Sequence, residues 1–79
     1  MTVAVAETGI IQLRGVCPIE DSEVLLRGLS ESPEAAVDMA DCEHAHSAVI
    51  QVLLAHRARL IGVPADPFLR LCLADLFHP

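Results

Sequence analysis

Short apolar runs alternate with segments of helical hydrophobic spacing along this chain, and that alternation most constrains its fold. Residues 2–6 and 10–14 read TVAVA and IIQLR, which predicts two consecutive strands, the second ended by Gly15. Further strands are predicted at residues 35–40 and 60–63, and helices at residues 19–30, 47–57 and 68–77. Asp66 and Pro67 supply a cap and a first-turn proline for the last helix. The order β-β-α-β-α-β-α predicts an α/β fold with a mixed, mostly parallel sheet and helices packed on it.

The apolar content of the chain is high for its length. Of the 79 residues, 53% are hydrophobic and the mean hydropathy is +0.50, which predicts one small domain over residues 1–79. A chain this short buries a small fraction of its surface, so we expect a protein partner or a homodimer to cover more of it. No apolar stretch is long enough for a membrane span and the N-terminus lacks a secretion signal, so a cytoplasmic location is expected.

The charge of the chain argues against nucleic acid as a partner. Eleven acidic residues face five arginines, for a formal net charge of −6. Such a charge repels phosphate backbones, and only two aromatic residues, Phe68 and Phe77, are available to stack on bases. We therefore expect no nucleic-acid binding.

Residues 42–47 read CEHAHS and bring a thiol, a carboxylate, two imidazoles and a hydroxyl together within six residues. They are predicted to form a loop at the carboxyl end of a parallel strand, where open α/β sheets bind ligands. Cys42, His44 and His46 offer sulfur and imidazole, so a small metal-binding or redox protein is one hypothesis. In an extended segment, however, residues two apart lie roughly 6.5 Å apart and residues four apart roughly 13 Å. Because that spacing spreads three ligands too far for one ion, no metal or cofactor is expected.

A catalytic thiol is a second hypothesis for this segment. A nucleophilic cysteine needs a base within hydrogen-bond reach and a third group to orient that base. Cys42 with His44 or His46 fills only two of these roles, and the chain has no G-x-S-x-G motif and no phosphate-binding glycine loop. The three cysteines, Cys17, Cys42 and Cys72, are widely spaced and are expected to be reduced core residues. We therefore expect a protein that is not an enzyme.

Nearly the whole chain also resembles a known family. LRGVCPIEDSEVLLRGL, from Leu13, is similar to the strand, glycine, turn and helix that open STAS domains, the family of bacterial anti-sigma-factor antagonists. VDMADCEHAHSAVIQVLLA resembles the family's central signature, and RLIGVPADPFLRLCLADLF resembles its next strand and helix. The resemblance implies a STAS-like domain in a short variant that lacks the last strand and helix, where typical members continue.

Within that signature the resemblance implies roles for single residues. Asp38 matches the aspartate that ends the buried strand, and Ser47 matches the serine that the antagonists' partner kinases phosphorylate. His46 stands where the family has aspartate, and Ala48 and Val49 replace its usual Ser-Gly pair. From chemistry alone Ser47 is equally well explained as a helix N-cap, and a phosphate there would meet the positive end of the helix dipole. The switch and the cap are both hypotheses for Ser47.

The predicted function is that of a non-catalytic, protein-binding regulatory module in bacterial signal transduction and transcription regulation. The resemblance implies a partner like the anti-sigma kinases, and it equally permits the cytoplasmic STAS subunit of a lipid or solute transporter. In that case the partner would be another transporter subunit, and no membrane span is expected in this chain. The expected partner surface comprises Asp41, Glu43, His44, His46 and Ser47.

Overall fold

The computed structural model describes residues 3–5 and 9–77, which form an α/β fold. Its strands are β1 (Val3–Val5), β2 (Ile10–Leu13), β3 (Gly15–Cys17), β4 (Ala36–Asp38), β5 (Cys42–Ala45) and β6 (Arg59–Gly62). Its helices are α1 (Glu20–Glu31), α2 (Ser47–Ala55) and α3 (Pro67–Cys72), and a 3-10 turn follows at Ala74–Leu76. The predicted α/β class is confirmed. Residues 2 and 6, the two ends of the first predicted strand, lie outside the described residues.

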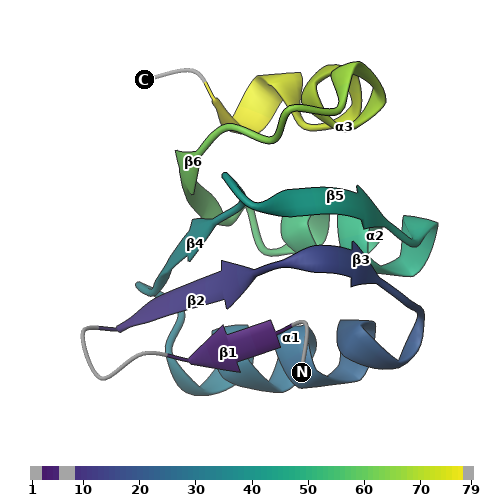
Figure 1. Ribbon diagram of the computed structural model, residues 1–79. Coiled ribbons are helices and arrows are strands. Elements are labelled where there is room, and N and C mark those ends of the chain that lie inside the picture. Colours follow the sequence, from purple (N-terminus) through teal and green to yellow (C-terminus); the bar gives the residue numbers. More distant parts are fainter. Residues whose placement is uncertain (1–2, 6–8, 78–79) are drawn as a thin grey trace.

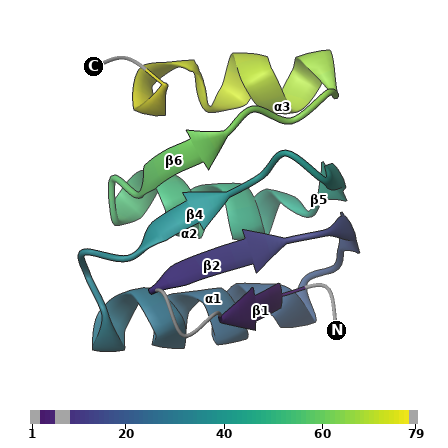
Figure 2. The ribbon, with the colours of Figure 1, turned by 60° about the vertical axis from the view of Figure 1, so that its left-hand side comes forward.

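Four of the strands form one sheet in the order β1-β2-β4-β6. β1 is antiparallel to β2, whereas β2, β4 and β6 are parallel, which confirms the predicted mixed sheet. Because each parallel strand is added on the same side of the one before it, right-handed crossovers place α1 and α2 on one face. Figures 1 and 2 show these two helices packed side by side on that face, with α3 beyond β6.

The core lies between the sheet and the helices. In β2, Ile11 and Leu13 are buried while Ile10 and Gln12 are half-buried, because successive residues of a strand face opposite sides. The largest fully buried hydrophobic side chains are Ile11, Leu13, Leu25, Leu29, Val37, Met39, Val49, Leu53, Leu69 and Leu73. Burial of each such leucine or isoleucine contributes about 1.5 to 3 kcal/mol. All three α-helices supply members, so the core fixes the position of each helix on the sheet.

After β4 the chain bends and forms a further strand, β5. Residues 42–47 were predicted to be a loop, and that prediction is wrong. After β4 the Asp38 carboxylate accepts a hydrogen bond of 3.0 Å from the amide of Ala40, and the chain turns into β5. β5 then pairs in parallel with β3, so residues 42–45 are a strand. The sequence does not predict this strand for two reasons. Its adjacent exposed residues Glu43 and His44 break the apolar pattern of a strand, and its pairing partner β3 is distant in the chain.

The second predicted strand ends at Leu13, before Gly15, but a further strand that the sequence did not predict, β3, begins at Gly15. The φ of Gly15 is +63°, a left-handed conformation that glycine adopts without strain, and its amide donates a 2.9 Å hydrogen bond to the carbonyl of Asp41. The chain therefore runs from β2 into β3. The two bent strands form a small two-stranded sheet, β3-β5, that continues the main sheet.

The start of α3 agrees with the prediction, but its end does not. Asp66 caps α3 as expected, since its Oδ1 accepts a 2.9 Å hydrogen bond from the amide of Phe68. The predicted last helix over residues 68–77 is interrupted, because Leu73 leaves helical geometry after Cys72 and the chain continues as a 3-10 turn. In the described part of the chain, no helix has the length and apolar character that a membrane crossing requires.

Candidate functional site

The residues predicted as the partner surface lie along one continuous stretch of chain, and all of them are exposed. Asp41 lies in the turn before β5, Glu43 and His44 lie on β5, and His46 and Ser47 begin α2. Between them, the buried side chains of Cys42 and Ala45 hold the stretch against the core. The surface is thus presented by a strand and a helix start, and not by the loop that the sequence suggested.

The residue that caps α2 is His46 and not Ser47. His46 is the N-cap of α2, and its Nδ1 accepts a 3.0 Å hydrogen bond from the amide of Ala48. The His46 carbonyl accepts a second hydrogen bond, of 2.9 Å, from the amide of Val49. Ser47 is therefore the first residue of the helix and not its cap, which corrects the N-cap hypothesis. Its exposed hydroxyl is not needed to start the helix.

An apolar groove opens beside this helix start, between α2 and α3. Its volume is about 520 Å³, and its lining residues are His44, Ala45, His46, Ser47, Ile50, Gln51, Leu54, Phe68 and Cys72. Phe68 is 57% exposed and Leu54 is 38% exposed, which is high for large apolar side chains. None of the lining residues is acidic, although the chain carries a formal net charge of −6. The sequence predicts a helix around each of these two residues but does not show that Leu54 and Phe68 border one groove.

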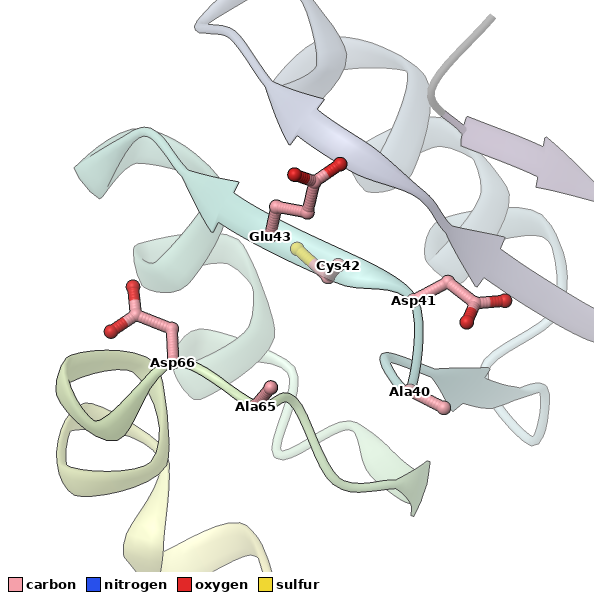
Figure 3. A pocket seen from close by; sticks show the side chains of 6 residues that line it. All are labelled: Ala40, Asp41, Cys42, Glu43, Ala65 and Asp66. Atoms are coloured by element: carbon pink, nitrogen blue, oxygen red, sulfur yellow. The ribbon is translucent and has the colours of Figure 1, made fainter.

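A second hollow lies between the start of β5 and the residues that lead into α3. This acidic cleft, of about 640 Å³, is lined by Ala40, Asp41, Cys42, Glu43, Ala65 and Asp66. Figure 3 shows its carboxylates spread around the cleft, with that of Asp41 pointing away from those of Glu43 and Asp66. No basic residue lines the cleft, so its potential is negative and favours cations in solution.

The thiol of Cys42 lies at the floor of the acidic cleft. Cys42 is 2% exposed, and its side chain is hydrogen-bonded to that of Cys17 on the neighbouring strand. That bond lowers the pKa of the Cys42 thiol, and a backbone hydrogen bond with His44 acts in the same direction. Burial and the carboxylates of Asp66 and Glu43 oppose this effect, because they disfavour negative charge on sulfur.

The proposed metal set is not brought together. Cys42 is buried with its thiol at the floor of the acidic cleft, whereas His44 and His46 are exposed and the Nδ1 of His46 already caps α2. Among the described residues, no three histidine, cysteine, aspartate or glutamate side chains are grouped so that they could hold a metal ion. The same three residues form no catalytic pair either, since the hydrogen-bond partners of the Cys42 thiol are Cys17 and the His44 backbone.

Comparison with known proteins provides no relative for this chain. No protein-family model matches it, and neither a curated protein nor a solved structure does.

Proposed function

We propose that this chain is a STAS-like module of a bacterial regulatory pathway that binds a protein partner, with Ser47 as its phosphate acceptor. The motif resemblance motivates the family, and the element order as far as α3 is compatible with it. Asp38 ends the central strand β4, as the aspartate of the family's signature does. No catalytic step is part of the proposal.

The observation that carries the proposal is the position of Ser47 at the end of the apolar groove. The groove offers exposed Leu54 and Phe68 to a partner, while His44, His46 and Ser47 provide polar groups at its border. Burial of such apolar side chains provides affinity, and the polar border provides orientation. A protein partner suits this arrangement because the groove is open and lies beside exposed strand and helix residues.

The same position gives Ser47 control over binding. Its hydroxyl is exposed, and a phosphate would add about two negative charges at the border of the groove. The amides at the start of α2 and the positive end of its dipole would favour that phosphate over the unmodified hydroxyl. A partner that packs beside Ser47 would then have to remove water from the charged phosphate or place its own negative charges near it. Either effect would weaken the complex.

A site-specific crosslinking experiment tests the location of the surface. A photo-crosslinking residue replaces Gln51, which lines the groove, and in a control chain it replaces Arg27, which is exposed on α1. We expect one protein to be captured reproducibly from native cells through position 51 and not through position 27. Equal capture at both positions would place the partner elsewhere and contradict the proposal.

Calorimetry with the captured partner then tests the switch. Ser47→Asp and Ser47→Glu are expected to weaken binding by about 1 to 3 kcal/mol, through repulsion or desolvation at the interface. Ser47→Ala is expected to bind as the parent chain does, because the Ser47 side chain makes no hydrogen bond in the part of the chain that the structure describes. If the acidic variants and the alanine variant bind equally well, Ser47 is not the control point.

A further inference from the structure

Two buried thiols face each other between β3 and β5. Cys17 is 0% exposed and Cys42 is 2% exposed, and their side chains are hydrogen-bonded to each other. In the parallel pairing of these strands Gly15 lies beside Cys42, and Cys17 lies beside Ala45. Residues 15 and 17 share a face of β3, and Gly15 has no side chain, so Cys17 is the first side chain that Cys42 meets on that face.

The two cysteines are diagonal neighbours and do not lie directly opposite each other. From a strand spacing of about 4.8 Å and a rise of about 3.3 Å per residue, the distance between their Cα atoms is roughly 8 Å. A disulfide needs about 4.4 to 6.8 Å, so its formation requires β5 to move toward Cys17. The pairing is already irregular between Gly15 and Val16, and Gly15 has the backbone freedom to absorb such a movement.

We propose that Cys17 and Cys42 form a reversible disulfide that changes the shape of the surface beginning at His44. This inference goes beyond the proposed function, and formation of the bond does not depend on it. The Cα spacing explains why such a bond would be reversible, because strained disulfides are more easily reduced. A bond that requires a shift of β5 also gives the oxidised and reduced proteins different shapes.

A small-molecule disulfide is the oxidant in this reaction. The thiolate of Cys42, which lines the acidic cleft, attacks one sulfur of the oxidant; a mixed disulfide forms and one small thiol leaves. Cys17 then gives up its proton and attacks the sulfur of Cys42, which releases the second small thiol. The two cysteines together lose two electrons and two protons, and the oxidant is reduced to two thiols. The lowered pKa of Cys42 favours it as the attacking group.

A hydrogen bond links this pair to the start of α2. The carbonyl of Cys17 accepts a 2.9 Å hydrogen bond from the backbone amide of His46, the residue that caps the helix. Moving β5 against Cys17 must change that bond or the helix cap next to it. The disulfide is therefore expected to alter the backbone at His46, Ser47 and Ala48.

Mass spectrometry of the full chain tests whether the bond forms. The protein is treated with cystamine, a cationic disulfide, and its remaining thiols are alkylated after unfolding. We expect a peptide pair joined through Cys17 and Cys42, with Cys72 alkylated, and full reversal by a dithiol reductant. Mixed disulfides alone, or a link that includes Cys72, would overturn the proposal. Because this readout uses the unmodified sequence, it does not depend on whether a variant folds.

Two comparisons sharpen the test. Cystamine is expected to react at least several-fold faster than an anionic disulfide such as glutathione disulfide, because Asp41, Glu43 and Asp66 line the route to Cys42. Equal rates would show that the thiol is reached by another route and would overturn that part of the proposal. The Cys72→Ser variant is expected to form the bond as the parent chain does, whereas Cys17→Ala is expected to stop at the mixed disulfide.

Backbone amide NMR spectra test the effect on the surface. Oxidation is expected to shift the amide signals of His46, Ser47 and Ala48, while that of Arg70 on α3 stays in place. If the disulfide forms but the signals of residues 46–48 do not move, the bond is real and its control of the surface is refuted. A loss of partner binding without a disulfide would concern only the proposed function, so the two failures are distinguishable.

Discussion

The carboxylate of Asp38 occupies the space that a side chain at position 62 would need. Asp38 on β4 and Gly62 on β6 are paired across two parallel strands, and a Cβ atom built on Gly62 would overlap the Oδ1 of Asp38. That Cβ would also lie 2.8 Å from the amide nitrogen of Ala40, which donates to the same carboxylate. The Asp38 turn that leads into β5 thus depends on the absence of a side chain at Gly62.

Gly62→Ala is expected to destabilise the fold by about 1 to 3 kcal/mol, the usual cost of overpacking a well-packed site. The methyl group must displace the Asp38 carboxylate and the Ala40 amide, which lie on the turn between β4 and β5. Chemical denaturation with two-state analysis measures the change in the free energy of unfolding. The double variant Asp38→Ala with Gly62→Ala should lose less stability than the sum of the two single variants.

Gly28→Ala is the matched control for that measurement. Gly28 lies within α1, and a Cβ there would meet only the terminal Cδ1 of the buried Ile11 side chain, at 3.2 Å, and no backbone atom outside the helix. The helix propensity of alanine favours this substitution by up to about 1 kcal/mol. We expect little loss of stability or a gain. Equal losses for Gly28→Ala and Gly62→Ala would contradict the special role given to Asp38.

His46→Ala is expected to destabilise the protein by about 0.5 to 2 kcal/mol, because it removes the side chain that caps α2. Ser47→Ala should change the free energy of unfolding much less, since Ser47 follows the cap. His46→Asp should restore the stability that alanine loses, because aspartate is a strong N-cap residue. Thermal and chemical denaturation of the three variants give the order; a larger loss in Ser47→Ala than in His46→Ala would refute the cap assignment.

Self-association or a stable complex at micromolar concentration is expected from the exposed apolar residues. Phe68 and Leu71 of α3 are 57% and 76% exposed, but only Phe68 lines the groove. If association uses the groove, Phe68→Ser should weaken it and Leu71→Ser should leave it nearly unchanged. Light scattering across a concentration series reports the result. A monomer at every accessible concentration, together with no partner from native cells, would contradict the expectation.

Protein purified without a chelator is expected to carry much less than one zinc ion per chain. The reason is geometric, since Cys42 is buried whereas His44 and His46 are exposed. Elemental analysis measures the content. Near-stoichiometric zinc that disappears in Cys42→Ala and in His44→Ala would restore the metal hypothesis.

The sequence alone determined the features that depend on neighbours in the chain. The order of the three α-helices and of the strands β1, β2, β4 and β6 follows from local hydrophobic spacing, and the cap of α3 follows from Asp66 and Pro67, which act within one turn. The exposure of Ser47 and its neighbours agrees with their polar character. These properties are visible because each is set by residues a few positions apart.

Only the tertiary structure decided the features that depend on distant pairings. Residues 42–45 form a strand because β3 lies beside them. The backbone of β3 provides the hydrogen-bond partners for β5, and no residue close in the sequence provides them. The same pairing brought Cys17 to Cys42, and the packing of α3 near α2 opened the groove beside Ser47. Local periodicity does not determine which strands and helices become neighbours, because those contacts depend on how the whole core is buried.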